Sequence, residues 1–227
     1  MLNPDVAGYG RWIVMEFVIS KFNILHRLTS ILTQIINLLI IFLTGTLLAL
    51  IPSVNAEGLM NGTQSGKTFV FLYAISGIGT LSLIQFIFQK RYLDIKISFL
   101  DFLLAIWIIY ITINGYFQGI HFSLRFLDLT GLVILYIVLR LINQKYYVFL
   151  FLAAMLGGLI QAVFGNLQLW NFYPSHHGLF KMTGSFFNPG PYAGYLAGVF
   201  PLALGFYLFK IKILSTGQIE KINLQTE

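Results

Sequence analysis

The strongest constraint on this chain is the clustering of its apolar residues into six stretches of about 20 residues each. A helix rises about 1.5 Å per residue, so a helix of this length crosses a hydrocarbon core about 30 Å thick. A transmembrane β-barrel is excluded, because its strands alternate polar and apolar residues over about ten positions. The sequence therefore predicts an all-α fold: a polytopic integral membrane helical bundle with six transmembrane helices. The predicted helices are Ile31 to Ile51, Thr68 to Phe88, Ile97 to Phe117, Leu124 to Leu141, Tyr147 to Leu169 and Tyr192 to Phe209.

Composition agrees with this prediction. Hydrophobic residues make up 57% of the chain and charged residues 10%, whereas soluble domains carry about 25% charged residues. An ordinary soluble domain is therefore excluded. The chain has 0 cysteines, so disulfides and thiolate metal sites are excluded as well.

Basic residues predict the orientation of the helices. Most Lys and Arg residues lie before the first predicted span, between spans two and three, between four and five, or after the sixth. Only Lys67, Arg125 and Lys181 lie on the other face. Short cytoplasmic loops are enriched in Lys and Arg, so the more basic face is predicted to be cytoplasmic. An even number of spans then places both termini in the cytoplasm.

The predicted spans divide the chain into three parts. Residues 1–30 mix charged residues with apolar residues at near-helical spacing, which is typical of an amphipathic segment at the cytoplasmic membrane interface. Residues 31–209 form the six-span membrane domain, and residues 210–227 form a cytoplasmic polar tail. The expected location is a membrane, with residues 1–30 and 210–227 on its cytoplasmic side.

Small residues are concentrated in the last two predicted spans. Gly194 and Gly198 form a Gly-x-x-x-Gly step, and the preceding span contains Gly157, Gly158 and Gly165. Small side chains let membrane helices approach closely. These faces are expected to pack on each other or on further helices.

The segment from Asn61 to Thr68 has part of the pattern of a phosphate-binding P-loop. It has three residues between its glycines where the motif needs four, and no buried strand precedes it. We therefore expect a flexible outer loop rather than a nucleotide site.

Arg125 and Asp128 lie one helical turn apart at the outer end of the fourth predicted span. Two interpretations remain open. The residues can form a local ion pair that neutralises two interfacial charges. Alternatively, Arg125 faces the bundle interior and binds an anionic headgroup through its planar guanidinium.

His176 and His177 lie in the longest outer loop. Adjacent histidines in an extended segment point apart, and no acidic cluster on this face supplies further ligands, so no metal site is predicted. Acid–base chemistry is the functional alternative, because histidine titrates near neutral pH. Otherwise the two side chains decorate the surface.

The segment before the sixth predicted span has the features of a rigid turn. Gly184 frees the backbone, Asn188 precedes a proline, and Pro189 fixes the backbone angle close to a helix start. Such a turn points free backbone N–H groups and the positive end of the helix outward, which favours phosphate. A simple helix-start structure is the alternative.

This segment, from Thr183 to Pro189, resembles the Gly-x-Phe-x-Asn-Pro segment of the O-antigen ligase and O-antigen polymerase superfamily of bacterial membrane proteins. The residues that match are Gly184, Phe186, Asn188 and Pro189. The resemblance implies transfer of glycan from a polyprenyl diphosphate carrier to an acceptor at the outer leaflet during surface polysaccharide assembly. It implies no cofactor and no metal. The expected partners are the carrier-linked glycan and membrane lipid, with no nucleic acid.

Transfer from a diphosphate carrier needs cations that stabilise the departing diphosphate. Lys181 and Arg125 are the predicted diphosphate-binding residues, with Lys67 as a further candidate. The catalytic residues stay unassigned, and His176 and His177 are weak candidates.

Full members of the superfamily have about twice as many spans and a later outer loop with the acting Arg and His, so the resemblance covers the amino-terminal half only. The chain is expected to need a carboxy-terminal half or a partner protein. Two alternatives are half of a transporter or flippase and a non-catalytic membrane scaffold. The transporter alternative lacks the mid-membrane carboxylates or histidines typical of ion-coupled carriers.

Overall fold

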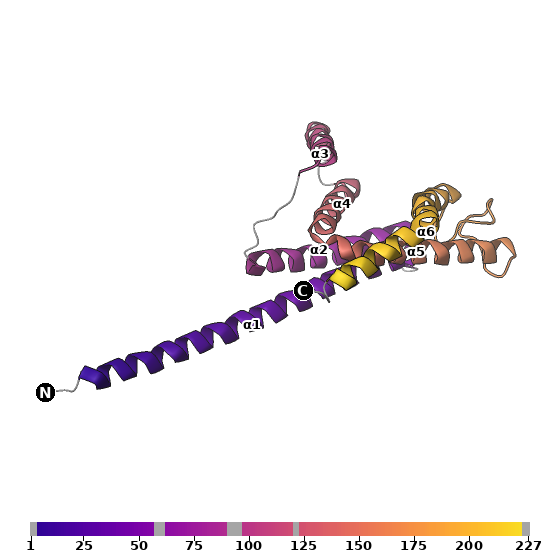
Figure 1. Cartoon of the computed structure of the whole chain (residues 1–227). Helices are drawn as coiled ribbons and strands as arrows, with labels where there is room; N and C mark the ends of the chain where they lie inside the picture. The colour runs from indigo at the N-terminus through magenta and orange to yellow at the C-terminus, as the bar shows by residue number, and fades with distance from the viewer. Residues whose placement is uncertain (1–3, 57–61, 90–96, 120–122, 224–227) are drawn as a thin grey trace.

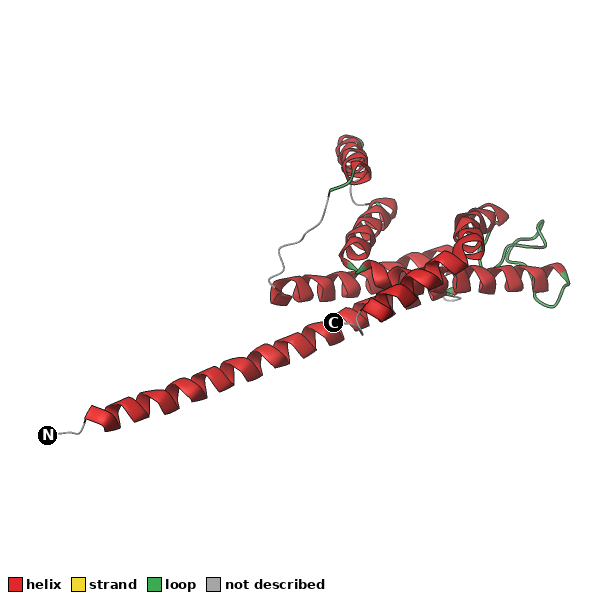
Figure 2. Ribbon diagram, viewed as in Figure 1, coloured by secondary structure: helices red, strands yellow, loops and turns green. Residues whose placement is uncertain are grey.

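The computed structural model describes residues 4–56, 62–89, 97–119 and 123–223 of the chain. Within these ranges all regular structure is helical, and no strand occurs (Figure 2). The elements are α1 (Pro4–Leu50), the short 3-10 helix η1 (Ile51–Ser53), α2 (Gly62–Gln89), α3 (Phe99–Phe117), α4 (Leu124–Leu141), the 3-10 helix η2 (Gln144–Tyr146), α5 (Tyr147–Leu169) and α6 (Pro189–Asn223). The all-helical prediction is confirmed.

Five helices in the described ranges are long and apolar enough to cross a membrane: Arg27–Ser53, Gly62–Phe88, Phe99–Phe117, Gln144–Leu169 and Pro189–Phe209. The fourth predicted span, Leu124 to Leu141, is present as α4 with the predicted bounds. It is not among the five, and its 18 residues include Arg125, Asp128 and Arg140. The count of six crossings and the location of the termini stay predictions.

Helix α1 is longer than the first predicted span. It runs without a break from Pro4 to Leu50, so residue 30 is not a helix boundary. Figure 1 shows its first half extending well beyond the other helices. The predicted interfacial segment 1–30 is, from Pro4 onward, the first part of this helix.

The core joins four helices. Helix α1 packs against α2 and α5, α2 packs against α4, and α5 packs against α6. Buried aliphatic side chains fill the contacts between α1, α2, α4 and α5: Ile40, Ile41, Leu47, Ile75, Ile78, Val138, Ile142 and Leu150. Dispersion contacts among these side chains hold the helices together. Lipid is as apolar as the core, so moving a side chain from lipid into the core gains no hydrophobic free energy.

The contacts of α5 with α1 and α6 show whether these helices run parallel or antiparallel. An added Cβ at Gly45 of α1 would lie 2.5 Å from the Phe149 ring, and one at Gly157 would lie 2.8 Å from Ala49 O. The contacts advance along α1 and α5 together, so these helices run the same way. Between α5 and α6 the order reverses, because Gly165 meets Tyr192 whereas Gly158 meets Val199.

Helices α2 and α4 also run the same way, because Gly131 lies against Phe71 whereas Ile134 lies against Gly79. With α1 antiparallel to α2 across their short connection, one end of the bundle gathers several segments. These are residues 51–56, the first turns of α2, α4 and α6, the end of α5, and residues 170–188. We call this the loop end.

Helix α3 lies at the edge of the bundle (Figure 1). Its first turn has a capping box, in which Ser98 and Asp101 each accept a hydrogen bond from the other's backbone. The Asp101 carboxylate also pairs with Arg140 of α4 at 3.0 Å and accepts a hydrogen bond from the Tyr136 hydroxyl. This polar cluster links α3 to the end of α4 that lies away from the loop end.

The small residues of α5 pack as the sequence predicts. Gly157, Gly158 and Gly165 are buried and lie against side chains of α6. Gly194 and Gly198 of α6 have no described atom within 4 Å of an added Cβ. The close approach therefore uses the glycines of α5 against larger residues of α6, not two glycine faces.

Replacing Gly165 should destabilise the α5–α6 contact. An added Cβ would lie 2.1 Å from the Tyr192 hydroxyl oxygen, and overpacking of this kind costs about 1–3 kcal/mol. We expect Gly165→Ala to lower the apparent melting temperature of the detergent-solubilised protein. Gly194→Ala is the matched control and should lower nothing, because its Cβ meets open space. Equal melting temperatures for Gly165→Ala and wild type would contradict this packing.

Candidate functional site

The turn predicted from Thr183 to Pro189 is a buried, hydrogen-bonded feature of the loop end. Thr183 is 0% exposed and Ser185 6% exposed. Buried backbone polar groups must find partners, and at this turn two glutamines of α5 supply them. Gln168 accepts a hydrogen bond from Thr183 N–H at 3.0 Å and donates to Gly184 O at 3.0 Å. The Gln168 side-chain amide thus supplies the hydrogen bonds that a helix or a sheet would give to these backbone groups.

Gln161 lies two helical turns before Gln168 on the same face of α5, and it binds Ser185 of the turn. Its side-chain oxygen accepts a hydrogen bond from Ser185 N–H at 3.0 Å, and its amide nitrogen donates to Ser53 Oγ of η1 at 2.9 Å. The Ser185 hydroxyl reaches Pro52 O. The turn is therefore joined to both α5 and the end of α1.

Gly184 is required at its position for two reasons. Its φ is +56°, in the left-handed region that side chains disfavour. An added Cβ would also lie 2.5 Å from the Tyr192 ring and 2.8 Å from the Gln161 side-chain oxygen. This motif residue shapes the backbone and makes room for α6.

Lys67, a further candidate for binding diphosphate, has a different role in the structure. Its ammonium donates to Val54 O at 2.7 Å, Thr63 O at 2.9 Å and Ser185 O at 2.8 Å. It also lies 4.9 Å from the centre of the Phe186 ring, a cation–π contact. All three N–H bonds are used within the chain, so Lys67 links η1, α2 and the turn instead of facing a ligand.

The region resembling a P-loop is helical from Gly62 onward, so the expectation of a flexible loop is wrong for these residues. Ala56 N–H donates to Gly62 O at 3.2 Å, and Gly66 is buried against Ala56. Together with Lys67, these contacts hold the first turn of α2 against the end of α1. Asn61 lies outside the described residues.

Asn188 and Pro189 form the start of α6. The Asn188 side-chain oxygen accepts a hydrogen bond from Gly190 N–H at 3.1 Å, as an N-cap does, and Pro189 is the first helical residue. At the other end of the loop, α5 closes with Asn171 at φ 63°, Asn171 N–H bonded to Gln168 O and Phe172 N–H to Leu167 O. This is a Schellman motif, with asparagine in the position usually taken by glycine.

The outer rim of the turn carries exposed polar groups. Lys181 and Asn188 are exposed, and His176 and His177 are half-buried. The His177 ring lies 4.8 Å from the Phe180 ring and 5.6 Å from the Phe187 ring, centre to centre. His177 is thereby held between the residues adjacent to Lys181 and Asn188.

Arg125 lies in the first turn of α4 and is exposed. Neither sequence interpretation of Arg125 with Asp128 describes it fully. No ion pair joins these two described residues, and the Asp128 carboxylate is hydrogen-bonded to the Thr68 side chain of α2. Arg125 shares the loop end with Lys181, but α4 packs on α2 whereas the turn packs on α5.

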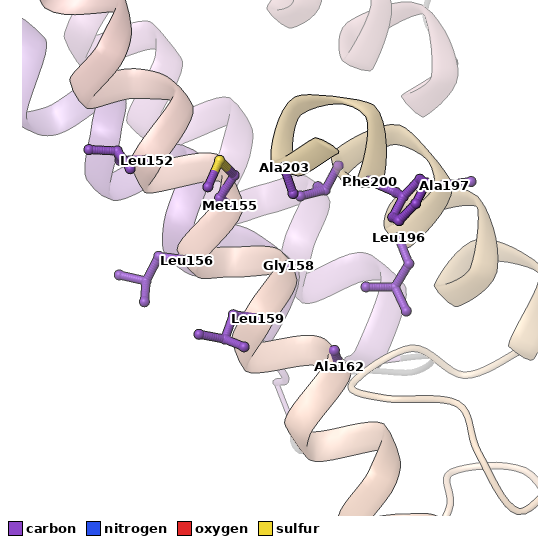
Figure 3. A pocket seen from close by; sticks show the side chains of 11 residues that line it. Leu152, Met155, Leu156, Gly158, Leu159, Ala162, Leu196, Ala197, Phe200 and Ala203 are labelled. Atoms are coloured by element: carbon purple, nitrogen blue, oxygen red, sulfur yellow. The ribbon is translucent and has the colours of Figure 1, made fainter. Parts of the chain in front are cut away.

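An apolar groove of about 860 Å³ runs along the contact between α5 and α6 and is lined by both helices (Figure 3). Its walls include Leu156, Leu159 and Ala162 of α5 and Leu196 and Phe200 of α6. Ala162 lies one turn before Gly165, whose added Cβ would be 3.2 Å from Met182 of the loop. The Ala162 end of the groove is therefore the end that lies toward the loop.

No cluster of three or more His, Asp or Glu side chains suitable for a metal occurs among the described residues. Comparisons with protein-family models, curated proteins and solved structures find no match to this chain. The functional argument therefore rests on the site itself.

Sequence reasoning missed the two glutamines that hold the turn. Gln161 and Gln168 are seven residues apart, two helical turns on one face of a span that is otherwise apolar. Buried amides in a membrane helix need partners, so this spacing was the available signal.

Gln168→Leu should destabilise the turn, because it leaves Thr183 N–H buried and unpaired. Losing a partner for a buried polar group costs about 1–3 kcal/mol. We expect a lower melting temperature in nanodiscs than for Asn166→Ala, which changes an exposed amide on the same helix that bonds only to Ala162 O. Equal stability of the two variants would show that Gln168 does not support the turn.

Proposed function

We propose that this chain is an O-antigen ligase-type or polymerase-type protein of the bacterial inner membrane. In this proposal it transfers glycan from a polyprenyl diphosphate carrier to an acceptor during surface polysaccharide assembly. The observation that carries the proposal is the Gly-x-Phe-x-Asn-Pro turn, immobilised by α1, α2 and α5, with Lys181 exposed beside it. The loop from Trp170 to Asn188 has no acidic residue, so its own charge favours an anion.

The chemistry fits this arrangement. The bond between the anomeric carbon and the diphosphate oxygen breaks, the acceptor hydroxyl oxygen forms the new glycosidic bond, and the hydroxyl proton passes to water. The diphosphate leaves with added negative charge, which Lys181 and Arg125 would stabilise. The apolar groove between α5 and α6 offers a surface for the hydrocarbon chain of the carrier.

The direction of the helices supports six crossings. Helix α4 lies beside α2 and runs the same way, so a bilayer that α2 crosses surrounds α4 as well. Its charged residues lie near its ends, where Lys and Arg side chains reach the interface. With α4 counted, the loop end is periplasmic and both termini are cytoplasmic.

Cysteine labelling tests this orientation directly, because the chain has 0 cysteines of its own. Leu179 is 86% exposed at the loop end, and Gln144 is exposed at the opposite end. In intact spheroplasts a membrane-impermeant maleimide should label Leu179→Cys and not Gln144→Cys. Labelling of Gln144→Cys alone would reverse the orientation and remove the proposed function.

Lys181→Ala and Arg125→Ala should each weaken use of the carrier. A hydrogen bond to a charged group contributes about 1.5–3 kcal/mol, so kcat/KM for the donor should fall about 10- to 100-fold. The assay is formation of the glycan ladder from the intact locus in a strain without its own ligase or polymerase. Lys145→Ala, an exposed change at the other end of the bundle, is the control.

No ladder from the unmodified locus would refute the assignment, and wild-type ladders from both variants would remove these two residues from the site.

A further inference from the structure

His177 is held in one orientation by its surroundings. Its backbone N–H donates to Ser175 Oγ at 3.2 Å, and Ser175 Oγ lies 3.2 Å from Thr183 Oγ1 in the buried turn. The imidazole ring contacts the Phe180 and Phe187 rings on either side of the loop. The ring is therefore positioned by the turn and not by chance packing on the surface.

The hydrogen bonds of His177 also identify its tautomer. Leu179 N–H donates to His177 Nδ1 at 3.1 Å. A backbone N–H is always a donor, so Nδ1 must be an acceptor without a proton, and the neutral ring carries its proton on Nε2. No described residue accepts a hydrogen bond from Nε2. Among the described residues, His177 thus has a free donor at Nε2 whose direction is set by the bond to Nδ1.

Two more donors, Lys181 and Asn188, belong to the same loop. Phe180 and Phe187, which contact the His177 ring, are the neighbours of Lys181 and Asn188. Lys181 offers only donors. The Asn188 side-chain oxygen is occupied by Gly190 N–H, so its amide nitrogen is the group left to bind a ligand. A loop that offers donors and no carboxylate is suited to an oxyanion.

We propose that His177 binds a phosphate oxygen of the diphosphate through Nε2–H, as a neutral hydrogen-bond donor and not as a general base. The inference rests on the proposed function, since the diphosphate is the ligand expected there. Lys181 supplies the charge, and His177 supplies a donor whose direction is set by Leu179 N–H. A base would need an unprotonated Nε2, which would place the proton on Nδ1 and break the bond from Leu179.

Two substitutions separate this role from packing. His177→Gln keeps an N–H donor near the position of Nε2 and loses the ring. His177→Phe keeps the ring between Phe180 and Phe187 and loses the donor. A donor role predicts that His177→Phe is the damaging change, whereas a packing role predicts that His177→Gln is.

The measurement is equilibrium binding of radiolabelled farnesyl diphosphate to the full chain in nanodiscs, with farnesol as the probe that lacks phosphate. We expect Kd for farnesyl diphosphate to rise at least about 10-fold in His177→Phe and to stay within about 3-fold in His177→Gln. Farnesol binding should be the same in all three proteins. The melting temperature of each variant confirms that it is folded. Weaker farnesyl diphosphate binding in folded His177→Gln would exclude the donor role even if His177→Phe did not fold.

Other outcomes overturn the inference. Unchanged farnesyl diphosphate binding in His177→Phe, weaker binding in folded His177→Gln, or an equal loss of farnesol binding would each exclude a phosphate-donor role. Absence of farnesyl diphosphate binding to wild type itself would instead refute the proposed function. The two failures are therefore distinguishable.

Discussion

The structure of the loop end depends on hydrogen bonds to buried backbone groups of one turn. A membrane protein cannot leave such groups to water within the apolar region, so an irregular segment persists there only if side chains pair with it. Gln161, Gln168 and Lys67 do this for residues 183–185. Because these three side chains come from α2 and α5, the turn can form only when the bundle has assembled around it.

This arrangement separates two kinds of polar residue at the same end of the bundle. Lys67 uses all its N–H groups on carbonyls of η1, α2 and the turn, and its charge is met by dipoles and an aromatic face. Lys181 and Asn188 lie on the exposed rim of the same turn. The inner set keeps the backbone rigid, and a rigid backbone lets the outer set keep fixed positions with respect to a ligand.

Much of the helical architecture was predictable. The bounds of α4 and α5 agree with the apolar stretches, because helix length is set by hydrocarbon thickness and by end signals such as Ser123 and Asn171. The start of α2 was missed, because Gly62 to Lys67 is polar and Gly-rich. These residues are held as a helix by contacts of Gly62 and Gly66 with Ala56 and by the bond from Lys67 to Val54 O. Likewise Lys67 was placed among the ligand-binding candidates. Its carbonyl partners could not be foreseen, because they lie up to 118 residues from Lys67 in the sequence.

The sequence by itself determined the helical, membrane-spanning nature of the chain, the helix-start role of Asn188 and Pro189, and the location of Lys181, His176 and His177 outside the spans. These follow from local rules of hydropathy, charge and backbone geometry. Only the tertiary structure decided which cation is internal and which is exposed, and which tautomer His177 adopts. Those properties depend on partners distant in sequence or on the fold of a loop, and neither residue type nor spacing specifies them.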